Sequence, residues 1–270
     1  MKLEFQAWEA NADLRAHPLY EIPGVNVFSL VFDTLHTVCK GIGTEIAGNC
    51  LDLIVRNVAG RNRVIRLATL WVELLECYKD EAVPHSSRLS QLTYDMFQTG
   101  KNEFPCLTGC KAAHLKYLLR PLRTLLNRHS DGSDEMAHAI VIVERLIRFY
   151  QIINGNPSYF LTSCESAELL KVSHELLLHY SFNARAACDR GIFRWNIKPK
   201  HHYFYHLAIM AKYVHPRVGW TYADEDFVGR IAKIAKSCVN GNGPYRFARY
   251  MMLKYIRVLH IRFSRRRLFQ

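Results

Sequence analysis

The last 44 residues of the chain, 227–270, contain no aspartate or glutamate. They hold 11 of the 36 lysines and arginines, whereas residues 1–226 carry 25 basic and all 24 acidic side chains. Nearly all of the formal net charge of +12 therefore lies in the last sixth of the chain. This asymmetry predicts a polyanionic partner, because clustered Lys and Arg release counterions when they neutralise phosphates.

The sequence also lacks the signatures of several protein classes. No run approaches ~20 uncharged apolar residues, and the N-terminal stretch carries acids without an apolar core, so we expect neither a membrane span nor a secretion signal. There is no Walker loop, no Gly-x-Ser-x-Gly motif and no Cys-x-x-Cys pair. The eight scattered cysteines are predicted to be reduced core thiols. We therefore expect a nuclear or cytoplasmic protein.

Apolar periodicity predicts a mainly α-helical chain. The best strand candidate is residues 25–32, a short run of β-branched and aromatic residues that follows a turn signal. Pro121 predicts a kink within one helix. Helices are expected at residues 33–58, 63–79, 87–97, 110–128, 136–153, 164–180, 182–190, 198–213, 222–239 and 245–262.

Two sets of residues are candidates for a catalytic or metal-binding role. Asp33 and His36 lie one helical turn apart directly after the predicted strand, a spacing that suits a metal-bound or catalytic group. The alternative is an aspartate that caps a helix, followed by an ordinary helical histidine. Asp224, Glu225 and Asp226 open an otherwise basic helix, where the helix dipole favours acids. Helix capping therefore competes with a role as a Mg²⁺ ligand.

Basic and aromatic residues alternate in the closing helix, which is a nucleic-acid signal of moderate value. Lys198, Lys200 and His201 are expected at the rim of a groove, with Phe204 and Leu207 packed inside. His202 and His206, four residues apart, suit zinc, but no further ligand is evident. The alternatives are a solvated basic face, docking of an amphipathic helix on the body, and an anionic membrane surface. The predicted nucleic-acid contacts are Lys198, Lys200, Arg230, Lys233, Lys236, Arg246, Arg249, Arg257, Arg262, Arg265, Arg266 and Arg267.

The order of these segments along the chain resembles that in the C-terminal part of cut-and-paste DDE/D transposases, especially the CACTA type and its transposon-derived relatives. Asp33 and His36 match the [C/D]-x-x-H signature of that group. Residues 105–113, PCLTGCKAA, are similar to its P-x-L-K-G-K-A-A stretch. Residues 200–207 are similar to its K-x-H-x-x-x-H-L helix, and residues 220–227 to the region of the last catalytic acid. The resemblance covers roughly residues 15–260.

The resemblance implies a partial RNase H-like core with a few strands near residues 25–32 and a large all-helical insertion. Residues 1–60 would be a core segment, 61–197 the insertion, and 198–270 returning core helices with a basic end. It also implies DNA strand transfer that depends on Mg²⁺ or Mn²⁺, with Glu225 or Asp226 as the third metal-binding acid. The family's first acid lies on an early core strand that is missing here. Its second acid lies upstream of the Asp-x-x-His motif, where Asp13 is the one candidate and does not follow a strand-like run. We therefore expect an incomplete DDE/D strand-transferase.

We therefore expect a transposase-derived protein that binds DNA and is not an active nuclease by itself. A homo-oligomer is possible on this interpretation. The alternative from another class is a non-enzymatic helical interaction module with a basic docking or localisation tail. A third hypothesis is a metal-dependent enzyme with a site assembled around His36 and Glu225. If the catalytic interpretation fails, no cofactor is expected.

Overall fold

The computed structural model describes residues 18–26, 29, 31–97, 103–239 and 243–267. The chain divides into two compact units, residues 1–219 and 220–270, called the first and the second unit below. Regular structure in the described residues of both units is helical, which confirms the prediction of a mainly α-helical chain. Within these residues, no helix has the length and apolar character needed to cross a membrane.

The first unit contains both short 3₁₀ or π-helical segments and longer α-helices. Its elements are η1 (Pro18–Glu21), the π-helix η3 (Leu35–Ile42), α3 (Gly43–Asn57), α4 (Arg63–Asp80), η4 (His85–Ser87), η5 (Tyr94–Met96), α5 (Ala112–Arg128), α6 (Asp134–Gly155), α7 (Ser163–Asp189) and α8 (Pro199–Met210). The second unit contains α9 (Tyr222–Lys236) and α10 (Pro244–Arg267).

The predicted strand at residues 25–32, and with it the RNase H-like core, is wrong. The described residues of this segment form no strand, and neither does any other residue in the described ranges. The main chain that follows the segment bonds to the loop after α8. The Thr34 N–H donates to the Gly219 carbonyl oxygen at 3.2 Å, and the Thr34 hydroxyl donates to the Pro216 carbonyl oxygen at 2.6 Å.

The apolar end of the same segment packs on a helix. The Phe32 ring stacks on Tyr203 and His206 of α8, with centroid separations of 5.5 and 5.9 Å. A short apolar run that is buried against a helix has the same composition as a buried strand, so periodicity could not distinguish the two.

Several helix limits differ from the predicted ones for physical reasons. The expected helix at residues 33–58 is divided at Gly41, which has the non-helical angles φ −112° and ψ −110°. Pro121 lies inside the continuous helix α5. The two helices predicted at 164–180 and 182–190 are one helix, α7, which begins with a capping box of Thr162 and Glu165. The expected helix at 87–97 is replaced by the short 3₁₀ turns η4 and η5.

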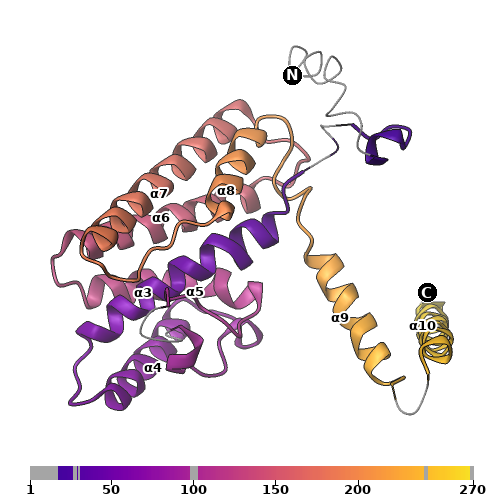
Figure 1. Cartoon of the computed structure of the whole chain (residues 1–270), viewed down its shortest axis with the longest axis horizontal. Coiled ribbons are helices and arrows are strands. Elements are labelled where there is room, and N and C mark those ends of the chain that lie inside the picture. The colour runs from indigo at the N-terminus through magenta and orange to yellow at the C-terminus, as the bar shows by residue number, and fades with distance from the viewer. Residues whose placement is uncertain (1–17, 27–28, 30, 98–102, 240–242, 268–270) are drawn as a thin grey trace. The chain divides into compact units, whose positions relative to one another are not determined.

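The core of the first unit is centred on α3. Figure 1 shows α3 running between the group α6, α7 and α8 and the pair α4 and α5. The long helices α6 and α7 form the most extensive pair, and α8 packs on η3 and α7. Every residue from Gly43 to Val55 is buried, so α3 is enclosed on all sides. Gly48 allows this, since a Cβ there would lie 2.5 Å from the main chain of Cys106.

Enclosing α3 also buries polar side chains, and these must find partners. The Asn49 side-chain oxygen accepts the Trp195 N–H at 2.8 Å, and its amide group donates to the Glu45 carbonyl oxygen at 2.8 Å. The same amide lies 3.4 Å from the Pro105 carbonyl oxygen. One buried asparagine therefore ties two loops to the central helix.

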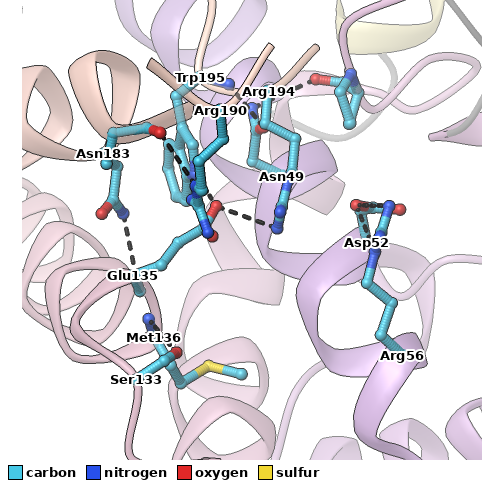
Figure 2. Close-up of polar contacts among 12 residues, drawn as sticks. Asn49, Asp52, Arg56, Ser133, Glu135, Met136, Asn183, Arg190, Arg194 and Trp195 are labelled. Atoms are coloured by element: carbon cyan, nitrogen blue, oxygen red, sulfur yellow. Dashed lines mark hydrogen bonds and ion pairs between the residues drawn. The ribbon is translucent and has the colours of Figure 1, made fainter. Parts of the chain in front are cut away.

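Glu135, at the start of α6, holds the same loop from the other side (Figure 2). Its carboxylate accepts hydrogen bonds from Trp195 Nε1 at 2.8 Å and from the Arg190 guanidinium at 2.9 Å, and it forms an ion pair with Arg194 at 3.0 Å. The Asn183 side chain donates to its carbonyl oxygen at 3.0 Å. Trp195 is fully buried and has a φ of 57°, a left-handed conformation that these bonds hold in place.

We predict that Glu135→Ala lowers the free energy of unfolding by about 3–5 kcal/mol, because it leaves the 7% exposed Arg194 as a buried unpaired charge. The measurement is urea unfolding followed by circular dichroism. The control is Asp189→Ala, which breaks the exposed pair with Arg185 and should cost less than about 1 kcal/mol. Equal losses in both variants would contradict the role of Glu135.

Candidate functional site

The second unit is a pair of contacting helices, α9 and α10, called the basic helix pair below. The rings of Phe227 on α9 and Tyr255 on α10 meet edge to face, with centroids 5.9 Å apart. The Lys254 ammonium on α10 donates to the carbonyl and the hydroxyl oxygen of Ser237, both at 3.0 Å. These contacts join the two helices.

The basic side chains of this pair are exposed. Arg246, Arg249 and Arg257 fall within about a quarter of a turn on α10, because eight residues are a little more than two turns. Among the described residues, Arg230 has an acidic partner, Asp226, in an ion pair whose two side chains are 50% and 63% exposed. The exposed members are Arg230, Lys233, Lys236, Arg246, Arg249, Lys254 and Arg257. Arg262, Arg265, Arg266 and Arg267 belong to α10, but their side chains lie outside the described part.

The acidic residues at the start of α9 do not assemble a metal site. Asp224 and Glu225 occupy its first turn, where the helix dipole favours negative charge, and Asp226 pairs with Arg230. No group of three or more His, Cys, Asp or Glu side chains in the described ranges could hold a metal ion. The residues present therefore do not fit a Mg²⁺ or Mn²⁺ site at Glu225.

Asp33 and His36 lie at the beginning of η3 in the first unit, whereas Glu225 and Asp226 belong to the second. The Asp33 carboxylate accepts the Leu35 N–H at 2.8 Å, and its other oxygen pairs with His36 Nδ1. The carboxylate thus bonds to the first turn of the helix, as a capping residue does.

A different constellation brings together three stretches that stand far apart in the sequence. A cavity of about 250 Å³, called the lysine cavity below, opens where η3, the loop before α5 and the start of α8 meet. It contains Cys106 from one stretch that resembles a transposase motif, and Lys200 and His201 from another. Its lining residues are Lys40, Gly41, Ile42, Thr44, Glu45, Cys106, Lys198, Lys200 and His201.

The π-helix η3 shapes one wall of this cavity. A π-helical turn is rare and is frequently found at functional sites. The Thr44 hydroxyl donates to the Gly41 carbonyl oxygen at 2.8 Å, which supports the main chain at the kink. A Cβ at Gly41 would lie 2.8 Å from Cδ of Lys200, so the aliphatic part of that lysine passes over the glycine.

Glu45 is the buried acid of the cavity. Its carboxylate pairs with the Lys198 ammonium, while Oε2 is buried without a hydrogen-bond partner among the described residues. Burial lowers the pKa of Lys198, but the hydrogen bond and charge of Glu45 together raise it above its usual value, so the ammonium stays charged. Burial and the neighbouring Glu45 raise the pKa of the Cys106 thiol, which therefore stays protonated at neutral pH.

His201 is the buried imidazole of the cavity, and it belongs to the first turn of α8. Its Nδ1 accepts the Lys198 N–H at 3.0 Å, in a capping box with that residue. Burial lowers the pKa of His201 to about 4, so the ring is neutral near pH 7. Its Nε2 is buried and has no hydrogen-bond partner within the described part.

Sequence reasoning singled out Lys198 and Lys200 but missed Lys40, Glu45 and Cys106. In the structure these two lysines contact α3 and η3: Lys198 pairs with Glu45, and Lys200 donates to the Lys40 carbonyl oxygen at 3.1 Å. The sequence did carry a signal for a buried polar site, because polar residues interrupt the apolar pattern of residues 43–55. His202 and His206, whose spacing suits zinc, have their two Nε2 atoms 3.0 Å apart, with no third ligand in the described ranges.

Comparisons with known proteins find no match: no family model fits the chain, and neither a curated protein nor a solved structure resembles it significantly.

We predict that His201→Gln removes part of the acid sensitivity of folding. The folded pKa of about 4 lies below the unfolded value of about 6.5, so protonation favours the unfolded chain. This contribution to stability is present above pH 6.5 and is lost as the pH falls to about 4, a change of about 3 kcal/mol. Glutamine keeps an acceptor for the Lys198 N–H.

Urea unfolding between pH 7.5 and 4.5 measures this difference. The control variant, His202→Gln, removes an exposed histidine from the same helix. If His201→Gln keeps the full wild-type pH dependence, His201 is not the buried neutral group described here.

Proposed function

We propose that the chain binds nucleic acid through the basic helix pair. The observation that carries the proposal is the set of seven exposed cations on α9 and α10, in a segment without acidic residues after Asp226. Residues 1–226 are nearly balanced in charge, so this segment is the main source of positive potential.

The electrostatics favour a phosphate backbone over isolated acidic side chains. Exposed single ion pairs contribute little, as the Arg230–Asp226 pair illustrates, because both charges are well solvated. A nucleic acid presents a regular row of phosphates, and each phosphate that is neutralised releases counterions. Arg246, Arg249 and Arg257 lie on one side of α10, which supports contact with such a row of phosphates.

Two further observations support the same class of partner. Tyr250, on the same helix, is 48% exposed and offers a ring on which an unpaired base can stack. The resemblance of residues 220–227 to the end of a transposase catalytic domain also favours DNA. Because the RNase H-like core is not seen, the proposal is limited to binding and includes no strand transfer. A nucleic-acid partner implies a nuclear or cytoplasmic location.

The rival proposal is a protein-interaction module. It is favoured by apolar side chains of the same helices, since Val228, Leu253 and Ile256 are each more than half exposed. Salt separates the two proposals, because apolar docking does not weaken as the ionic strength rises, whereas phosphate contacts do.

We expect fluorescence anisotropy with a ~20-base-pair duplex to show affinity that falls steeply between 50 and 300 mM salt. If most of the seven exposed cations contact phosphates, the slope of log K against log salt is about −4 to −6. Replacing Arg246, Arg249 and Arg257 by Gln should reduce the magnitude of the slope by about 2–3 and weaken binding at least ~10-fold.

The matched control replaces three exposed cations of the first unit, Lys171, Arg185 and Lys212, by Gln. It should change the affinity for the duplex less than ~3-fold, since these residues lie outside the basic helix pair. Absence of binding at ~50 mM salt, or an equal loss in the control, would overturn the proposal.

A further inference from the structure

We propose that the lysine cavity binds a small ligand that carries a protonated phosphate group, either hydrogen phosphate itself or a monoprotonated phosphomonoester. The cavity lies wholly within the first unit, so this inference is independent of nucleic-acid binding by the basic helix pair. Its volume of about 250 Å³ is several times the ~30 Å³ that one water molecule occupies, and it therefore has room for such a ligand.

The charges that line the cavity favour an anion. Three lysines, Lys40, Lys198 and Lys200, face one carboxylate, Glu45. The Lys40 ammonium donates to the Cys110 carbonyl oxygen at 3.0 Å, and that of Lys200 to the Lys40 carbonyl oxygen at 3.1 Å. An ammonium carries three N–H donors, so each lysine can bind an oxyanion and keep its present bond.

The first turn of α8 adds to the positive potential. Lys198, Lys200 and His201 all come from this turn, which contains no acidic residue. The helix dipole places a partial positive charge at the same end, where cations are unfavourable and anions are stabilised. Glu45 already offsets the charge of Lys198, whereas Lys200 adds a second cation at this helix N-terminus that a bound anion offsets.

Two buried polar atoms define the ligand further. His201 and Glu45 are 6% and 4% exposed, and His201 Nε2 and Glu45 Oε2 have no hydrogen-bond partner among the described residues. A buried carboxylate oxygen requires a donor, and the neighbouring protonated Cys106 thiol is only a weak one. An anion that carries an O–H group supplies this donor while its other oxygens meet the lysines. Hydrogen phosphate has such a group, whereas sulfate at the same pH has none.

The test is isothermal titration calorimetry of the full chain with sodium phosphate and sodium sulfate at pH 6.5 and matched ionic strength. We expect one phosphate per chain and sulfate binding at least ~10-fold weaker, because sulfate leaves the buried Glu45 oxygen without a donor. Equal affinities for the two ions, or no binding of phosphate, would overturn the proposal.

Substitutions test whether phosphate binds in the lysine cavity. Lys200→Met should weaken phosphate binding at least ~10-fold, because a charge-assisted hydrogen bond is lost. The control Lys212→Met, an exposed lysine just after α8, should leave it unchanged, as should the triple glutamine variant of the basic helix pair. If the triple variant loses phosphate binding while Lys200→Met keeps it, the ion binds at the basic helix pair and the proposal fails.

Glu45→Gln tests how the ion is selected. The glutamine amide both donates and accepts, so we expect sulfate to bind within ~3-fold of phosphate in this variant. A retained preference for phosphate would exclude Glu45 as the acceptor. Since the variant also breaks the pair with Lys198, its fold is checked by circular dichroism; if it is unfolded, Lys200→Met and the wild-type ion preference decide.

A 5′-mononucleotide at pH 6.0 distinguishes the two sources of the phosphate group. About half of its phosphate groups still carry a proton at that pH. Tighter binding than inorganic phosphate identifies a phosphomonoester as the ligand, and weaker binding identifies the free ion. If neither probe binds in a way that depends on Lys200, the cavity is not a phosphate site.

Discussion

The fold of the first unit depends on one constraint: α3 is enclosed on every side, so each polar group on it needs a buried partner. Asn49 meets this need by bonding to the main chain of Trp195, and Glu135 completes the contact through the Trp195 indole. The loop that contains Trp195 is thereby held against α3 and α6 by side-chain hydrogen bonds. Removing one of these partners leaves a buried polar group unpaired, which costs more than the bond itself contributes.

The same constraint determines where the polar residues of the lysine cavity lie. Glu45 is on the buried helix and therefore draws Lys198 to it, and Gly48 admits the Cys106 main chain to the same side of the helix. The loop that Trp195 anchors leads directly into α8, so the anchor also fixes the first turn that supplies Lys200 and His201. The cavity is thus a consequence of how the core is closed.

The helical class and several helix limits followed from the sequence, because the 3.6-residue pattern of apolar positions is strong in segments such as α4 and α6. The error at residues 25–32 arose because burial against a helix and burial in a sheet select the same residue types. The lysine cavity was not predicted as a unit, since its residues come from three distant stretches and Glu45 has no motif of its own. The exposed cations after Asp226 could be read directly, since surface charge does not depend on distant contacts.

The chain therefore combines a helical body organised around a buried helix with a separate pair of helices that carries most of the net charge. Hydrogen exchange of the full chain with and without a ~20-base-pair duplex at low salt tests this division most directly. The account predicts that amides of α3 exchange last and are unaffected by the duplex, while those of α9 and α10 exchange early and are slowed by it. Slowing confined to the first unit, or α3 amides that exchange before those of α6 and α7, would contradict it.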